Sequence, residues 1–168
     1  MWYRISAKKK VSLVIIFNDD KVLLGEKISG YEIPGGHTNY LEDEKDCARR
    51  EIEEETGLKV KNLHLLRIMD MPDKIVSVYY SDNFEGKLLA ASDLIGVSWH
   101  KIQDLPKIKF NGAELIMEAA QKLKKWHCAL EGAMKLKLSP MELIICIMVI
   151  LTLSAIFIPI FYLAWSSF

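Results

Sequence analysis

A glycine-rich loop followed by a glutamate-rich segment constrains this chain more than any other feature. From Gly36 to Leu58 the residues follow the pattern G-x5-E-x7-R-E-U-x-E-E-x-G-U, where U is aliphatic, and every specified position is filled. From average residue frequencies, such a match arises by chance on the order of 10⁻¹⁰ times per starting position. The loop and the segment after it are therefore read together, as one functional unit.

The second half of the pattern predicts a helix with carboxylates on one face. Residues 43–56 suit a helix, and Gly57 is placed to end it. Glu51, Glu54 and Glu55 stand at i, i+3 and i+4, so their carboxylates share one face. Such an oxygen-rich site suits a hard divalent cation such as Mg²⁺. The alternative is an ordinary solvated face with i, i+4 ion pairs.

The complete pattern resembles the signature of the Nudix hydrolases, which cleave a nucleoside diphosphate linked to another group. The resemblance covers roughly the first three quarters of the chain. It implies hydrolysis with Mg²⁺, or with Mn²⁺ in its place. It also implies roles for named residues: Glu54 and Glu55 as metal ligands, Glu51 as metal ligand or general base, the carbonyl of Gly35 or Gly36 as a backbone ligand, Arg50 as the residue that orients Glu51, and Glu42 as the partner of Arg50.

Four further residues are candidates for the site, each with a plainer alternative. The resemblance implies a fourth acidic metal ligand, for which Asp93 is our choice, although it also suits a turn. Asn111 is placed to read a purine edge or to cap a helix. His37 is placed to touch substrate or to be solvated in its loop. Tyr31 is placed to stack on a base or to pack in the core.

The remaining pattern predicts strands around one central helix, and then a final helix. Strands are predicted at 11–17, 21–27, 58–69, 74–80 and 95–99, and a helix is predicted to start near Gly112. The Nudix fold resembles this arrangement, so the predicted class is α/β, an α/β/α sandwich with a mixed sheet, plus one C-terminal transmembrane helix.

The end of the chain carries a second signal. From Leu143 to Leu163 there is no charged residue, and at ~1.5 Å per residue this run spans about 30 Å as a helix, the thickness of a bilayer core. We therefore predict a Nudix domain at 1–128, a basic juxtamembrane connector at 129–140 and a transmembrane helix at 141–165. A buried helix or an oligomer contact is the alternative for the last segment.

Charge predicts the orientation. Lysines gather before the apolar run and none follows it, so the positive-inside rule places the domain in the cytoplasm. The connector either lies on the membrane surface or continues the last helix in solvent. The formal net charge of +0 and pI of about 6.9 do not indicate a partner that is a nucleic-acid polymer.

The function predicted from these observations is Mg²⁺-dependent hydrolysis of a nucleoside diphosphate-linked substrate at a membrane surface. A compact domain favours a nucleoside triphosphate, such as an oxidised dGTP, over ADP-ribose. The alternative is a membrane-tethered module that binds a nucleotide or a partner without hydrolysis. Glu51, Glu54 and Glu55 are all present, which favours the enzyme.

Overall fold

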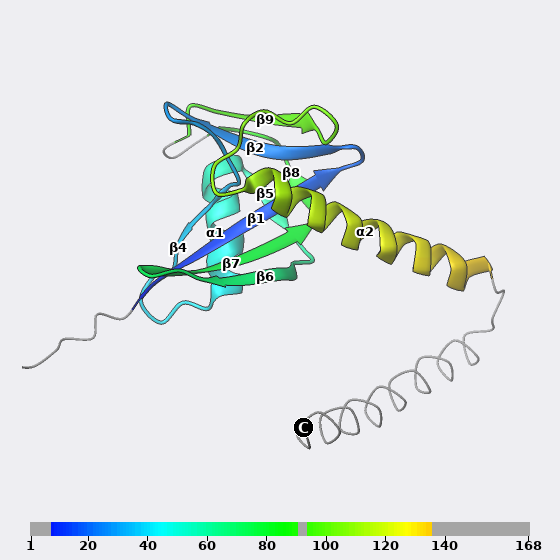
Figure 1. The fold of residues 1–168 in the computed structure, drawn as a ribbon, viewed down its shortest axis with the longest axis horizontal. Coiled ribbons are helices and arrows are strands. Elements are labelled where there is room, and N and C mark those ends of the chain that lie inside the picture. Colours follow the sequence, from blue (N-terminus) through cyan, green and yellow to red (C-terminus); the bar gives the residue numbers. More distant parts are fainter. Residues whose placement is uncertain (1–7, 91–93, 136–168) are drawn as a thin grey trace, which may run out of the picture. The chain divides into compact units, whose positions relative to one another are not determined.

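The computed structural model describes residues 8–90 and 94–135 (Figure 1). In chain order the elements are β1 (Lys9–Asn18), β2 (Lys21–Lys27), β3 (Gly30–Glu32), β4 (Gly35–His37), α1 (Glu44–Thr56), β5 (Leu58–Val60), β6 (His64–Asp70), β7 (Lys74–Ser81), β8 (Phe84–Gly86), β9 (Gly96–Lys101) and α2 (Gly112–Lys135).

Among the described residues, seven strands form one mixed sheet. The main path runs β3-β2-β1-β7-β6, with β4 also paired to β1 and β9 also paired to β2. β1 and β7 are parallel, from Lys9 opposite Lys74 to Ile16 opposite Ser81, and the other pairs are antiparallel. β5 and β8 form a separate two-stranded sheet. This confirms the α/β class and the mixed sheet.

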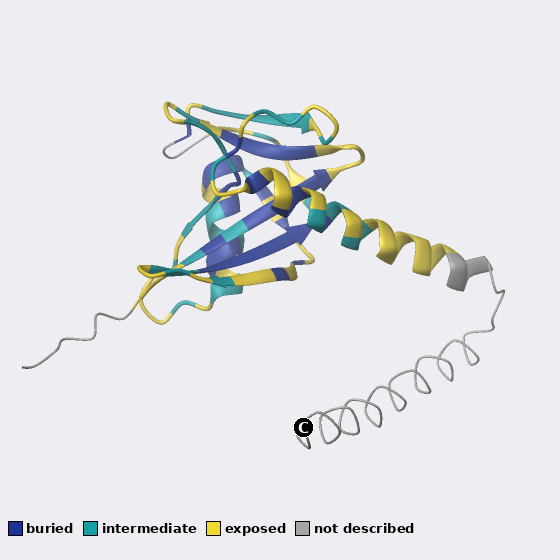
Figure 2. Cartoon of the chain, in the orientation of Figure 1, coloured by how far each residue is buried: buried dark blue, intermediate teal, exposed yellow. Residues whose placement is uncertain are grey.

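Strand β1 lies in the middle of the sheet, between β2 and β7, and both of its faces are covered. Val14, Ile15, Ile16 and Phe17 are all almost fully buried, so the strand reads as a continuous apolar run rather than an alternating one (Figure 2). Val14 and Ile16 belong to the core that Ala48 and Ile52 of α1 complete. Side chains alternate along a strand, so Ile15 and Phe17 face the other side of the sheet.

The predicted helix and its end are confirmed in α1. Asp43 has extended backbone (φ −71°, ψ 146°), and its carboxylate accepts a hydrogen bond from Lys45 N at 2.9 Å, which caps the first turn. Gly57 ends the helix in the left-handed conformation (φ 72°), where a side chain is disfavoured. Cys47, Ala48 and Ile52 are buried on the face toward the sheet, which leaves the glutamates free to face the loop.

One strand prediction is wrong. The segment predicted as a single strand at 58–69 forms two strands, β5 and β6, with Lys61, Asn62 and Leu63 between them. β5 pairs with β8, whereas β6 pairs with β7 at the edge of the large sheet. Lys61 N donates to Asn83 O at 3.0 Å where the chain passes between the sheets. The apolar pattern continues through the break, so it cannot show that the partner strand changes.

The helix predicted near Gly112 is confirmed as α2. Its first turns bury Leu115, Ile116 and Ala119 and lie over the sheet on the side away from α1 (Figure 1). The compact unit that contains the sheet ends at Lys122. The helix itself continues to Lys135, through the boundary predicted at 128.

Within the two described ranges, no helix is long and apolar enough to cross a membrane. The segment predicted to span the membrane, 141–165, lies outside the described residues, as do residues 136–140 of the connector.

Candidate active site

Arg50 joins the loop to the carboxylates of α1. Its Nε donates to Glu42 Oε1 at 2.7 Å, and its Nη2 donates to Glu42 Oε2 at 2.8 Å. Its Nη1 donates to Glu51 Oε1 at 2.8 Å and to Glu54 Oε2 at 3.1 Å. Its Nη2 also donates to the carbonyl of His37 at 3.1 Å. One guanidinium therefore sets the positions of three acidic side chains and of the loop backbone.

The Arg50 contact changes the acidity of Glu42. The guanidinium hydrogen bonds, together with a 2.8 Å hydrogen bond from Asn39 N, lower the pKa of Glu42 from 4.5 to about 2. In turn, the hydrogen bonds to Glu42, and then those to Glu51, raise the pKa of Arg50 above its ordinary value. Arg50 is therefore permanently charged and cannot serve as a base.

Two glutamates lie against the glycine loop. Glu55 is 3% exposed, and its Oε2 accepts a hydrogen bond from Gly35 N at 2.8 Å. A Cβ on Gly36 would lie 2.3 Å from the Glu51 carboxyl carbon, so a larger residue there would displace this carboxylate. A Cβ on Gly35 would lie 2.1 Å from the Ser12 carbonyl oxygen. Gly35 is therefore required by the close approach of β4 to the β1 backbone, whereas Gly36 leaves room for the Glu51 carboxylate.

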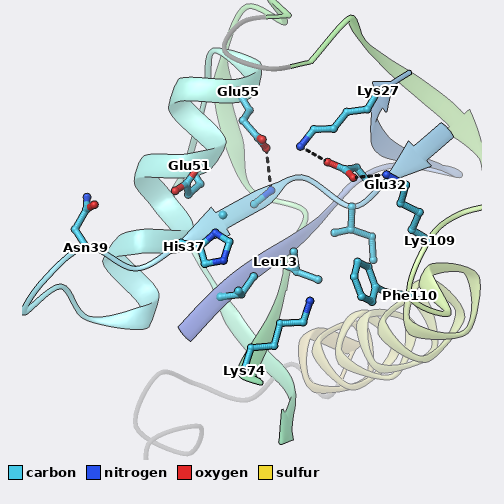
Figure 3. A pocket seen from close by; sticks show the side chains of 14 residues that line it. Leu13, Lys27, Glu32, His37, Asn39, Glu51, Glu55, Lys74, Lys109 and Phe110 are labelled. Carbon is cyan, nitrogen blue, oxygen red and sulfur yellow. Dashed lines mark hydrogen bonds and ion pairs between the residues drawn. The ribbon is translucent and has the colours of Figure 1, made fainter. Parts of the chain in front are cut away.

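These groups line a pocket of about 530 Å³ (Figure 3). Of the predicted site residues, Gly35, Gly36, His37, Glu51 and Glu55 line it. Its other lining residues are Val11, Leu13, Lys27, Glu32, Ile33, Asn39, Lys74, Lys109 and Phe110. The pocket thus has carboxylates on the α1 side and lysines from β2, β7 and the segment before α2.

The other predicted residues lie beside the pocket or outside the described ranges. Glu54 points to Arg50 with its side chain 54% exposed. Tyr31 packs its ring edge-on against His100, with ring centroids 4.9 Å apart. Asn111 is exposed, and its carbonyl accepts the Leu115 N–H at 3.2 Å at the start of α2. Asp93, the predicted fourth acid, lies in the undescribed segment 91–93. The roles assigned to these residues stay predictions.

The donor chemistry fits a hard divalent cation, although the side chains are not gathered around one. Glu51, Glu55 and the Gly35-Gly36 backbone supply oxygen atoms at one wall of the pocket, as Mg²⁺ prefers. Among the described residues, no three His, Cys, Asp or Glu side chains converge closely enough to form a metal group. Glu54 would have to leave Arg50 to join the other two glutamates.

Five pocket residues belong to no motif from which the sequence would predict a place in the site: Lys27, Glu32, Asn39, Lys74 and Lys109. Each is an ordinary polar residue in its own segment, and the segments meet only in the folded chain. Phe110 is marked only as an aromatic, but it lines the pocket with Lys74 Nζ 4.3 Å from its ring centre.

Comparison with known proteins decides the family, because the NUDIX domain model matches residues 7–119. The chain belongs to the Nudix family. It is a Nudix hydrolase, a pyrophosphohydrolase that acts on phosphoanhydride bonds.

Two curated relatives share this region. An ADP-ribose pyrophosphatase of Methanocaldococcus jannaschii is 30% identical over 115 residues, which cover 62% of this chain and 68% of that protein. An oxidized purine nucleoside triphosphate hydrolase of Danio rerio is 32% identical over 114 residues, which cover 58% of this chain and 69% of that protein. Their names give two different substrates, so the likeness does not choose between them.

The fold has close counterparts among solved structures. A MutT NUDIX hydrolase from Burkholderia pseudomallei superposes with a TM-score of 0.61 and 22% identity, and the match covers 67% of this chain and 98% of that chain. At this identity the likeness establishes the fold of the Nudix domain alone.

Proposed function

We propose that this Nudix hydrolase cleaves nucleoside triphosphates, with an oxidised purine nucleotide of the dGTP type as the preferred substrate. The observation that supports this most directly is the composition of the pocket. Glu51, Glu55 and the glycine backbone lie on one wall, and three lysines lie around the rest of the space. A polyphosphate needs both a cation held by carboxylates and positive side chains for the oxygen atoms that the cation does not cover.

The proposed roles follow from the contacts. A divalent cation, bound by Glu54, Glu55 and the carbonyl of Gly35 or Gly36, would neutralise charge on the phosphate oxygens, and Glu51 would be a further ligand or the general base. Glu51 is the candidate general base, because it lines the pocket and one of its oxygens is held by Arg50. Arg50 positions Glu51 and is itself held by Glu42. Four further residues remain candidates for contacts with the metal or the substrate: Asp93, His37, Tyr31 and Asn111.

The nucleobase is proposed to enter at the end of the pocket formed by Val11, Leu13 and Phe110. This end is apolar, and the Phe110 ring is 56% exposed with Lys74 against it. A flat base can stack on an exposed ring. The position of Asn111, next to Phe110, supports a role in reading the base edge, and the competing role is that of the residue that caps the start of α2.

We also propose that the domain is tethered to a membrane by 141–165 and faces the cytoplasm. Support comes from the uncharged run in the sequence and from the lysines that precede it: Lys122, Lys124, Lys125, Lys135 and Lys137.

The substrate proposal is tested with a panel of nucleotides. The full-length protein is incubated with Mg²⁺ or Mn²⁺ and with oxidised and normal dGTP, other nucleoside triphosphates, ADP-ribose and NAD. Pyrophosphate and phosphate release is measured for the triphosphates, and the formation of nucleoside monophosphate is measured by chromatography for every compound. We expect the highest kcat/KM for an oxidised purine triphosphate. A higher kcat/KM for ADP-ribose rejects the triphosphate proposal, and binding without turnover for every compound rejects catalysis.

A further inference from the structure

The second half of α2 is an amphipathic helix. The unit that contains the sheet ends at Lys122, and from Leu123 the helix continues to Lys135. Leu123, Trp126 and Leu130 follow the spacing i, i+3, i+7, so they lie within about 60° of one another around the helix axis. They therefore form one narrow apolar stripe, which we call the α2 stripe.

The α2 stripe is open on its surface. Trp126 is 56% exposed and Leu130 is 52% exposed, whereas Leu123 is partly buried. The exposed stretch continues along the helix from Lys124 to Glu131 (Figure 2). Single apolar residues on a surface are ordinary, but two large ones on the same stripe of a helix have the pattern of a contact face.

The rest of this helix segment is basic. Lys124 and Lys125 are exposed and lie on opposite sides of the helix, each about 130° from the middle of the stripe. Between Leu123 and Pro140 the sequence has four lysines and one glutamate. Long lysine stems let the ammonium groups reach an anionic surface beside an apolar face. The segment therefore complements a partner that is apolar within and negatively charged at its boundary.

A second copy of the chain is the other occupant to consider. In a two-stranded coiled coil with Leu123 at an a position, Trp126 takes the d position, where leucine is favoured. The e and g positions that flank the stripe are then His127 and Ala129, and this pair offers no opposite charges between chains. The composition thus favours a lipid surface over a helix pair.

We propose that residues 123–132 lie in the plane of an anionic membrane surface, with Trp126 and Leu130 at the boundary between headgroups and acyl chains. Helices with an apolar stripe and a lysine-rich polar face bind membranes in this way, and indole rings favour that depth. The choice of a membrane rests on the proposed tether, because the uncharged run at 143–163 follows in the same chain and would hold this helix near lipid. By itself the contact is weak and is released by salt.

The test measures the depth of Trp126 in the membrane. The full-length protein is reconstituted into vesicles of phosphatidylcholine, alone or with about 30% phosphatidylserine. Tryptophan fluorescence is quenched from the water by acrylamide, and from the membrane by lipid brominated on its acyl chain near the headgroup. Subtracting the signal of Trp126→Phe from that of the wild type removes the contributions of Trp2, Trp99 and Trp165.

Two sets of substitutions separate the electrostatic and the apolar parts of the contact. Lys124→Gln combined with Lys125→Gln removes two charges, and Leu130→Gln removes part of the stripe. Each is made with and without Trp126→Phe, so that the Trp126 signal is obtained in every background. Thermal melts of each protein monitor folding.

Matched controls make the same chemical changes elsewhere on the surface. Lys21→Gln combined with Lys101→Gln removes two charges from exposed residues that are opposite each other on β2 and β9. Ile28→Gln removes an apolar side chain from a residue that is 97% exposed. Neither control touches α2.

With phosphatidylserine present, we expect brominated lipid to quench at least about half of the Trp126 signal. Acrylamide should quench that signal at least about threefold less than in phosphatidylcholine alone, because the lysines need anionic headgroups. The double lysine variant should lose the dependence on phosphatidylserine, and Leu130→Gln should lower quenching by brominated lipid about threefold. Both controls should behave as the wild type does.

Three results overturn the proposal. Trp126 that acrylamide reaches equally in both kinds of vesicle, without quenching by brominated lipid, shows a solvated helix. Protection from both quenchers shows that protein, such as a second copy, covers the stripe. Quenching by brominated lipid that is equal without phosphatidylserine, or that falls as much in the controls, shows that this basic helix does not recognise an anionic surface. Failure of the tether is distinguishable, because high salt then removes the protein from the vesicles, while at low salt the quenching of Trp126 still depends on phosphatidylserine.

Discussion

Arg50 holds Glu42 through two parallel hydrogen bonds, from Nε to Oε1 at 2.7 Å and from Nη2 to Oε2 at 2.8 Å. Glu42 lies in the loop before α1, and Arg50 lies on α1 itself, so this pair fixes the loop on the helix. Because the remaining donor group of Arg50 contacts Glu51 and Glu54, a change at Glu42 is transmitted to the carboxylates that the site needs.

The Glu42–Arg50 pair should make stability depend on pH in acid. The pKa of Glu42 is lowered to about 2 from 4.5, so its stabilising contribution is fully present above about pH 4.5 and is lost as the pH falls toward 2. We expect the free energy of unfolding to differ between the wild type and Glu42→Gln by a constant amount above about pH 5. That difference should shrink between about pH 4.5 and 2. Urea melts at pH 7, 5, 4 and 3 measure it, and a difference that does not change with pH contradicts the assignment.

Neutral substitution of the glutamates on α1 should separate the catalytic face from the solvated face. Glu51→Gln and Glu54→Gln should each lower kcat/KM by at least about two orders of magnitude at subsaturating Mg²⁺, with the fold intact. Glu53→Gln is the control, because Glu53 is exposed and pairs with Lys59. Steady-state kinetics and circular dichroism check this. Near-normal activity of Glu54→Gln would show that Glu54 stays with Arg50 and binds no metal.

The two loop glycines should fail in different ways. Gly35→Ala places a Cβ against the Ser12 backbone at a φ of 146°, so it should destabilise the protein by roughly 2–4 kcal/mol. Gly36→Ala meets only the movable end of the Glu51 side chain. It should therefore lower kcat by about tenfold and cost less than about 1 kcal/mol of stability. Thermal melts and kinetics on both variants distinguish the two effects, and a reversed order refutes this account of the loop.

Substitution of Asn111 should separate its two alternative roles. The residue has a φ of 54°, a left-handed conformation that asparagine tolerates and alanine does not. If Asn111 only caps the start of α2, Asn111→Ala should lose about 1 kcal/mol of stability, Asn111→Gly should lose less, and both should keep the wild-type preference among nucleobases. Reading of a base edge predicts altered kcat/KM ratios in both variants. Ratios measured on the nucleotide panel decide between the roles.

Removal of the apolar tail should release the protein from membranes. The full-length chain is expected to stay in the membrane fraction through high salt and alkaline wash, because a hydrophobic anchor is not electrostatic. A chain ending at Lys135 keeps all of α2 and the whole pocket, so it should be soluble and active. Fractionation and activity assays check both proteins. A full-length chain that is soluble without detergent, or a truncated chain that cannot fold, refutes the tether.

The sequence alone was sufficient for the features that depend on neighbouring residues. Asp43 and Gly57 mark the two ends of α1, because capping is decided within one turn of a helix. The spacing of Glu51, Glu54 and Glu55 likewise predicts a shared face, since helical geometry is local. The glycine loop and these glutamates were enough to predict the family.

Only the tertiary structure decided which of these residues meet. It buries Glu55 against Gly35, leaves Glu54 outside the pocket with Arg50, and divides the predicted strand at 58–69 between two sheets. It also brings Lys27, Glu32 and Lys109 to one wall from separate segments. These outcomes depend on contacts between residues far apart in the chain. Local periodicity carries no information about such contacts, because each segment acquires its partners only when the sheet and helices pack together.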